Sequence, residues 1–168
     1  MSSNNELIAI VEISKNSRLK YEINKDTGRL YLDRIVSGAC VYPHNYGYIE
    51  ETLDGDGDAL DVMVVSQEAL HPGVEVPVRI LGALRMIDGG ERDTKLIGVI
   101  SVDARYNSLK TFKDLPTGMA NEIVDFFNNY KKLDNKEVVT NGFVEDPVEI
   151  SKIIQDAKKL YLESCGKK

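Results

Sequence analysis

Cysteine and histidine are scarce in this chain, with only two of each among 168 residues. Cys40 and Cys165 lie far apart, and no Cys-x-x-Cys pair or Cys/His cluster occurs. A structural zinc site is therefore not expected, since such sites use closely spaced Cys and His ligands. Two lone cysteines are typical of a reducing compartment and favour a cytoplasmic location. No motif places a base beside either thiol, so neither is expected to be catalytic.

The chain also lacks an excess of positive charge. Lys and Arg total 21 against 27 for Asp and Glu, which gives a formal net charge of -6. General nucleic-acid binders show a basic excess, so this class is not expected, although a local basic pocket is not excluded. The N-terminal stretch MSSNNELIAIVEI has no basic start, and Glu12 interrupts its apolar run. Neither a signal peptide nor a membrane span is expected there.

Length and composition fit one domain over residues 1–168, with 42% hydrophobic and 29% charged residues. Runs rich in β-branched residues predict strands in the first half, at 7–13, 19–36, 61–65, 74–88 and 95–101. The run 19–36 predicts a hairpin, because Gly28 ends a Lys-Asp-Thr-Gly turn and can adopt a positive φ.

Two helices are predicted after these strands. Apolar residues recur on one helical face within 114–133. In 145–165, Asp146 as N-cap, Pro147 in the first turn and Glu149 at the third helical position form a capping-box arrangement. This order of elements indicates a small closed or nearly closed antiparallel β-barrel with two helices packed outside.

Four aspartates crowd the segment LDGDGDALDVMVV, residues 53–65. A calcium-binding EF-hand would use Asp54, Asp56 and Asp58 as its ligands at positions 1, 3 and 5. That loop requires Gly at position 6 and Glu at position 12, where this chain has Ala59 and Val65. The flanks also predict strands rather than helices, so an EF-hand is not expected.

Two other interpretations of this loop remain. A solvated acidic turn explains Asp54-Gly55, because Asp-Gly pairs are common in turns. It explains Asp61 poorly, because Asp61 begins a run that should be buried, where a carboxylate is costly unless it is paired or metal-bound. In a hard-cation site, Asp56, Asp58 and Asp61 would converge, and Mg²⁺ takes such oxygen ligands.

A second acidic segment, RMIDGGERDTKLIGV, offers partners for the first. It places Asp88 and Asp93 around a Gly89-Gly90 turn, before Lys95 enters a predicted strand. Taken alone, it could be another acidic hairpin. Two acidic loops that each lead into an apolar strand indicate one shared cation cluster.

Candidate anion-binding residues lie near these loops in the sequence. Lys20 and Glu22 alternate with apolar residues and so share a strand face, and Arg34 lies in the partner strand. A basic residue in a strand is more often an exposed edge charge. The segment YPHNYGY supplies hydroxyls that can bind phosphate, although such residues are usually core or rim: Tyr42, Tyr46 and Tyr48.

These motifs together resemble family I soluble inorganic pyrophosphatases. DGDALD, residues 56–61, is similar to the family signature Asp-x-Asp-Pro-x-Asp. The other matching motifs follow in the family's order: EI at 12–13, KYEI at 20–23, DR at 33–34, YPHNYGY at 42–48, the Asp88, Asp93 and Lys95 group, and FFNNYK at 126–131. The resemblance covers nearly the whole chain, from about Ile10 to the last predicted helix.

The resemblance implies a five-stranded, OB-like barrel and Mg²⁺-dependent hydrolysis of pyrophosphate to two orthophosphates. It implies Asp58 as the carboxylate that activates the attacking water. The implied metal ligands, for several Mg²⁺ ions, are Asp56, Asp61, Asp88 and Asp93. The implied phosphate-binding residues are Lys20, Arg34, Tyr46 and Tyr130, with Lys131 and Lys95 close by, and the supporting residues are Glu12, Glu22 and Tyr42. It also suggests a homohexamer.

The chain departs from the family pattern at two positions, with Ala59 and Ser14 where proline is usual. Neither removes an implied ligand, but Ala59 predicts a less rigid loop. Asp54 precedes the signature and is expected to be a surface turn residue without a role. Two alternatives stay open: a metal-dependent phosphohydrolase acting on a nucleotide, although no P-loop occurs, and a non-enzymatic barrel that binds nucleic acid.

Overall fold

The computed structural model describes residues 6–166, so the first five residues of the N-terminal stretch lie outside the described part. Five strands form a closed ring, in which β6 pairs with β1 to complete the order β1–β4–β5–β8–β6. These strands are β1 (Glu6–Ile13), β4 (Asn45–Ile49), β5 (Leu60–Val65), β6 (Glu75–Asp88) and β8 (Lys95–Ile100). The expected five-stranded barrel is confirmed.

One pairing in the ring is parallel, so the expectation of a fully antiparallel barrel is wrong. Strand β5 pairs with β8, and Asp61 lies opposite Lys95 at the start of both strands. The chain passes from β5 into β6 before it returns in β8, which pairs antiparallel with β6 and therefore runs in the direction of β5. This pairing brings the ends of the two acidic loops together, because each loop leads into one of these strands.

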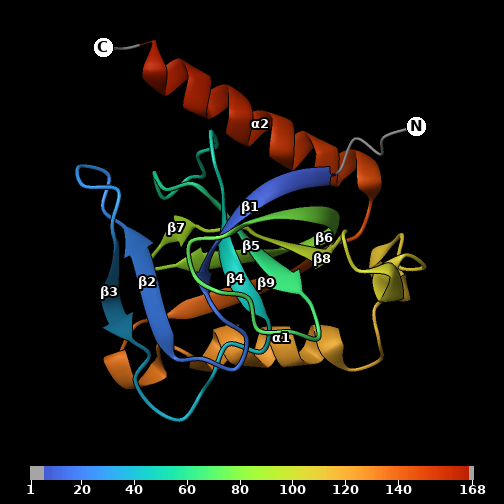
Figure 1. Cartoon of the computed structure of the whole chain (residues 1–168), viewed down its shortest axis with the longest axis horizontal. Coiled ribbons are helices and arrows are strands. Elements are labelled where there is room, and N and C mark those ends of the chain that lie inside the picture. The colour runs from blue at the N-terminus through green and yellow to red at the C-terminus, as the bar shows by residue number, and fades with distance from the viewer. Residues whose placement is uncertain (1–5, 167–168) are drawn as a thin grey trace.

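Two further pairings extend the ring, and a third forms a separate sheet. The long strand β6 also pairs with the short β7 (Glu91–Arg92) and with β9 (Val138–Val144). Strands β2 (Leu19–Ile23) and β3 (Leu30–Ile35) form a separate two-stranded sheet. This is the predicted hairpin, and Gly28 in its turn has a φ of +69°. Figure 1 shows the hairpin beside the ring.

Helices α1 (Met119–Asn129) and α2 (Pro147–Cys165) lie on opposite sides of the barrel (Figure 1). Both match the predicted segments. Helix α1 buries Ile123 and Phe127 in an apolar cluster with Tyr46 and Met63 of the ring. Within residues 6–166, no helix combines the length and the apolar character needed to cross a membrane.

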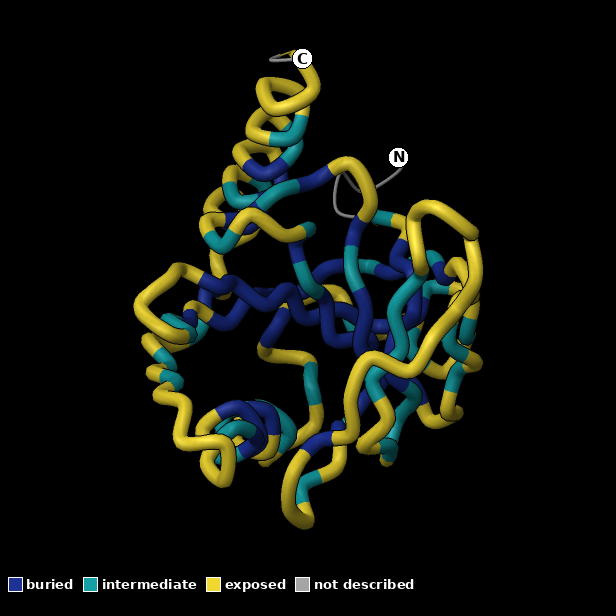
Figure 2. The backbone as a smooth tube through the Cα atoms, turned by 90° about the vertical axis from the view of Figure 1, so that its left-hand side faces the viewer, coloured by how far each residue is buried: buried dark blue, intermediate teal, exposed yellow. Residues whose placement is uncertain are grey.

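Burial is concentrated in the ring strands, whereas long stretches of the hairpin and of the outer side of α2 are exposed (Figure 2). Strand β8 is buried along its whole length, and strand β3 is exposed along its whole length. The ring is therefore the fixed frame from which the acidic loops extend, and the hairpin is a peripheral element.

Candidate active site

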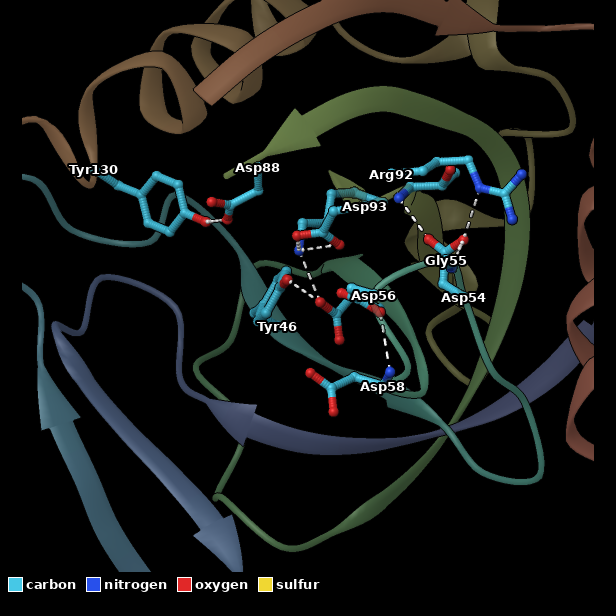
Figure 3. Close-up of polar contacts among 12 residues, drawn as sticks. Tyr46, Asp54, Gly55, Asp56, Asp58, Asp88, Arg92, Asp93 and Tyr130 are labelled. Carbon is cyan, nitrogen blue, oxygen red and sulfur yellow. Dashed lines mark hydrogen bonds and ion pairs between the residues drawn. The ribbon is translucent and has the colours of Figure 1, made fainter. Parts of the chain in front are cut away.

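One cavity of about 270 Å³ collects nearly all the predicted site residues. Its wall contains seven carboxylates: Glu12, Asp56, Asp58, Asp61, Asp88, Glu91 and Asp93. The remaining lining residues are four cations and three tyrosines: Lys20, Arg34, Lys95, Lys131, Tyr42, Tyr46 and Tyr130. Of the predicted set, Glu22 alone is not in this wall, and it lines an adjoining cavity that shares Glu12, Lys20, Asp58 and Asp61. Figure 3 shows the acidic residues from both loops facing one another.

The first acidic loop is a tight turn held by its own backbone. The amide of Asp54 donates to the carbonyl of Asp58 at 2.8 Å, and the amide of Gly57 donates back to Asp54 at 3.0 Å. Gly57 has a φ of +83°, a conformation that glycine adopts without strain. The amide of Asp58 also donates to Asp56 Oδ1 at 3.0 Å. These bonds place Asp56 and Asp58 in the cavity wall.

Lys95 joins the two acidic loops at the base of the cavity. Its Nζ donates to Asp61 Oδ2 at 2.7 Å and to Asp93 Oδ2 at 2.9 Å, and its side chain is only 3% exposed. The hydroxyl of Tyr46 donates to the same Asp61 oxygen at 2.7 Å. Burial alone would lower the pKa of Lys95, but attraction to Asp61 and Asp93 outweighs it and raises the pKa, so the ammonium stays charged.

Asp88 forms the opposite rim of the cavity, at the end of β6. It forms an ion pair with Lys131 and accepts a hydrogen bond of 3.2 Å from the hydroxyl of Tyr130. Both partners lie at the C-terminal end of α1, where Tyr130 is the C-cap and packs against Phe126 and Phe127. The packing of α1 therefore determines where these two polar groups meet Asp88.

The hairpin supplies the other two cations of the wall. Lys20 and Arg34 lie opposite each other in the β2–β3 pairing. Lys20 pairs with Glu22 at 3.2 Å, whereas the nearest carboxylate oxygen to Arg34 is that of Asp33, at 3.9 Å. Partial burial raises the pKa of Glu22, but the hydroxyl of Tyr31 and the ammonium of Lys20 outweigh it, and the net shift is downward.

Negative charge in the cavity exceeds the positive charge placed beside it. Burial raises the pKa of Glu12 to about 7, and attraction to Lys20 only partly offsets this. Burial also raises the pKa of Asp56 to about 6, and Asp93 adds to the shift by repulsion. The pKa of Asp93 itself is raised by burial in spite of Lys95. Additional positive charge in the cavity would stabilise the ionised form of all three groups.

The carboxylates of the predicted cation cluster line one cavity but are not arranged as the coordination shell of a metal ion. Among residues 6–166, no three Asp, Glu, His or Cys side chains are grouped as a metal-binding site. Lysine partners occupy part of the ligand set, because Lys95 bridges Asp61 and Asp93, and Lys131 pairs with Asp88. The carboxylate oxygens nevertheless line one space.

Sequence reasoning missed two residues of this region. Glu91 lines the cavity from β7, and its place between Asp88 and Asp93 in the second acidic loop was the available signal. Asp54 lies in a turn, as expected, but it is only 7% exposed, so its assignment as a surface residue is wrong. Its carboxylate accepts hydrogen bonds from the amides of Gly55 and Thr94, both at 2.7 Å, and from Arg92 Nε at 3.2 Å.

Comparison with known proteins agrees with this geometry. A family model described as "Inorganic pyrophosphatase" matches residues 9–162. An inorganic pyrophosphatase of Ureaplasma parvum is 49% identical over 94% of this chain and 87% of its own length. Soluble inorganic pyrophosphatase 5 of Arabidopsis thaliana is 43% identical over 92% of this chain and 71% of its own. The crystal structure of the inorganic pyrophosphatase of Thermus thermophilus superposes with a TM-score of 0.89, at 36% identity, and covers 96% of this chain and 94% of that one.

Proposed function

Because this chain belongs to the inorganic pyrophosphatase family and hydrolyses pyrophosphate to two orthophosphates, we propose that it does so with Mg²⁺ held on the carboxylate side of the cavity. The observation that carries this proposal is the composition of the cavity wall. Seven carboxylates face four basic side chains, so the wall can take up both a divalent cation and a phosphate anion.

The residues present fit Mg²⁺ by their chemistry. In the described part of the chain, the polar side chains of the cavity wall include no His and no Cys, and Mg²⁺ prefers oxygen ligands. Burial raises the pKa of Asp56, and repulsion from Asp93, Asp58 and Asp54 adds to it, so a cation bound at this carboxylate would stabilise its ionised form. The residues that would hold the metal are Asp56, Asp61, Asp88 and Asp93. When bound, Mg²⁺ neutralises phosphate charge and makes water more acidic.

Asp58 is the proposed general base. It lies between Asp56 and Asp61 in the chain and lines the same cavity. Within the described residues, its carboxylate has no hydrogen-bond or ion-pair partner, whereas Asp61 and Asp88 are both engaged. An unengaged carboxylate beside the reacting phosphate can accept the proton of the attacking water.

The basic side chains and tyrosines are proposed to bind and orient pyrophosphate. Arg34 is 42% exposed and lies 3.9 Å from Asp33 through Nε, which leaves much of its planar guanidinium available for phosphate oxygens. Lys20, Lys95 and Lys131 add positive charge while each is paired with a carboxylate. The hydroxyls of Tyr46 and Tyr130 point to Asp61 and Asp88, so they also orient the proposed ligands. Glu12, Glu22 and Tyr42 are proposed to support this arrangement.

We also propose that the chain is a homo-oligomer, a hexamer by family resemblance, and that it acts in the cytoplasm. One face of the hairpin supports self-association, because its apolar residues are 36–57% exposed: Leu19, Leu30, Leu32 and Ile35. The location is supported by the two cysteines, which are both free.

Substrate choice tests the proposal against a nucleotide phosphohydrolase. Phosphate release is measured from pyrophosphate and from ATP at equal concentration with saturating Mg²⁺. We expect pyrophosphate to be turned over by far the faster. Equal or faster turnover of ATP would contradict the proposed substrate class.

A further inference from the structure

We propose that Asp54 is a positioning residue that fastens the first acidic loop to the segment 92–95 and so fixes Asp56 relative to Asp93. The inference rests on the proposed function, because Asp56 and Asp93 matter for activity only if they bind the metal. Asp54 itself lies outside the cavity wall and is not proposed to touch substrate or metal.

The contacts of Asp54 join two segments that are about forty residues apart in the chain. Its Oδ2 accepts from the amide of Thr94 at 2.7 Å, and its Oδ1 accepts from the amide of Gly55 at 2.7 Å. Arg92 Nε donates a third hydrogen bond, of 3.2 Å, to Oδ1 of Asp54. The Arg92 side chain is 64% exposed, so this donor approaches Asp54 from the solvent side. Figure 3 shows Asp54 between Gly55 and Arg92. Thr94 lies between Asp93 and Lys95 in the chain. The hydrogen bond from the Thr94 amide to Asp54 therefore holds the segment that carries both residues.

The two segments are in direct contact at this point. A Cβ added at Gly55 would lie 3.2 Å from Arg92 Cβ and 3.3 Å from the Arg92 carbonyl oxygen. Such spacing is tighter than most contacts of a real Cβ, so a larger residue at position 55 would require Arg92 to shift by a few tenths of an ångström. We call this contact of Asp54 and Gly55 with Arg92 and Thr94 the joint. Because the joint is packed as well as hydrogen-bonded, a shift of one segment is transmitted to the other.

A carboxylate is required at this joint. Asp54 offers two acceptor oxygens to two backbone amides and one guanidinium, and its burial is tolerated because of these bonds. An asparagine of the same shape offers one acceptor oxygen, and its NH₂ group would face a backbone N–H. Asp54→Asn therefore breaks either the link to Thr94 or the link within the loop, with little change in volume.

The base of the loop is held separately, by Thr52. Its hydroxyl donates to the carbonyl of Ile49 at 2.6 Å and accepts from the amide of Leu60 at 2.9 Å. Neither bond reaches the segment 92–95. Thr52→Val removes these two buried hydrogen bonds but leaves the contacts of Asp54 intact. It is therefore the matched control, because it destabilises the same loop without breaking the joint.

The test measures metal binding and backbone exchange on metal-free protein. Calorimetric titration with Mg²⁺ should show roughly 10–100-fold weaker binding by Asp54→Asn, the usual effect of losing a partner behind a metal ligand. Hydrogen exchange should accelerate in peptides that cover residues 54–60 and 91–96 together. Thr52→Val should accelerate exchange in the first peptide only and leave Mg²⁺ affinity within about twofold. Activity of Asp54→Asn should recover at high Mg²⁺.

Unchanged Mg²⁺ affinity in folded Asp54→Asn, or an equal loss in Thr52→Val, would overturn the positioning role. A wild-type protein that binds no Mg²⁺ would instead overturn the proposed function and this inference with it. If Asp54→Asn does not fold, Arg92→Ala removes only the exposed donor. We then expect about threefold weaker Mg²⁺ binding and faster exchange in both peptides, and no change in either would overturn the proposal.

Discussion

The two sides of the cavity differ in how firmly their charged groups are held. On the carboxylate side, Lys95 begins a strand of the closed ring, is 3% exposed and bonds two aspartates. On the hairpin side, Arg34 is 42% exposed and lies on β3, whose one pairing among residues 6–166 is with β2. The same cavity thus combines groups fixed by buried contacts with groups on an exposed, peripheral sheet.

This difference follows from what each side is proposed to bind. Mg²⁺ demands a near-ideal arrangement of oxygens, so its ligands need a rigid frame. A phosphate anion can be held by flexible basic side chains. Because these side chains are exposed, salt screens their attraction to the anion. Changes on the carboxylate side should therefore alter kcat and metal dependence, whereas changes on the hairpin side should alter KM and its dependence on salt.

The largest effect of a single substitution is expected for Asp58→Asn, which preserves shape and removes the proposed base. Loss of general-base help should lower kcat by about 10²–10⁴-fold. Added Mg²⁺ should not restore it, in contrast to Asp54→Asn. The measurement is kcat across Mg²⁺ concentration and pH, with circular dichroism to confirm the fold. A loss below threefold, or one that Mg²⁺ reverses, would remove Asp58 from the chemistry.

A smaller effect, mainly on KM, is expected for Arg34→Ala. A lost hydrogen bond to a charged group is worth about 1.5–3 kcal/mol, so KM should rise roughly 10–100-fold. High salt should raise the KM of the wild type in the same direction. Arg29→Ala, an exposed arginine beside β3 that does not line the cavity, is the control and should leave KM within about twofold. An equal rise in KM for the two substitutions would show that pyrophosphate binding depends on the total positive charge of the hairpin and not on Arg34 itself.

The dependence of stability on pH tests the burial of Glu12 on the carboxylate side of the cavity. The pKa of Glu12 is raised to about 7 in the fold, so folding favours its neutral form. The stability that this group contributes is complete below about pH 4.5 and is lost as the pH rises through 7. Glu12→Gln stays neutral, so in EDTA its Tm should exceed that of the wild type by roughly 5 °C at pH 9.

That difference in Tm should vanish near pH 5, where Glu12 of the wild type is protonated in the fold. Glu75→Gln changes an exposed carboxylate on β6 and should show no such dependence. A constant difference between wild type and Glu12→Gln at both pH values would contradict the assigned charge state.

The smallest effect is expected when the two cysteines are replaced, since neither side of the cavity uses a thiol. Cys40 packs beside the cluster that contains Tyr42, and Cys165 is exposed at the end of α2. The double Ala variant should keep kcat within about twofold, with a slightly lower Tm from the lost packing at Cys40. A folded double variant without activity would be inconsistent with this account.

Local signals were sufficient for most elements of the fold. The turn at Gly28 and the apolar faces of the two helices depend on neighbouring residues, and they were predicted correctly. The parallel pairing of β5 with β8 depends on how distant strands meet, and no local pattern reports it. Strands β4 and β9 were both missed. Strand β4 contains Gly47, which weakens a strand pattern, and much of β9 is exposed with a weak apolar pattern.

Contacts between distant residues also explain the errors around the site. The partners of Asp54 are 38 and 40 residues away, so its burial could not be read from the loop. Glu149 pairs with Arg85 instead of completing the predicted capping box, of which only the Asp146 bond to the amide of Val148 is present. All residues that line the cavity except Glu91 could be named from motifs, whereas the contacts that hold them could not.

Metal dependence of pyrophosphate hydrolysis is the most direct test of the account. Protein stripped with EDTA is assayed for phosphate release from pyrophosphate while Mg²⁺, or Ca²⁺ in a parallel series, is added back. We expect no turnover in excess EDTA, full recovery with Mg²⁺, and inhibition rather than recovery with Ca²⁺, which prefers more ligands and looser geometry. Full turnover in excess EDTA would contradict the claim that the carboxylate side of the cavity works by holding a divalent cation.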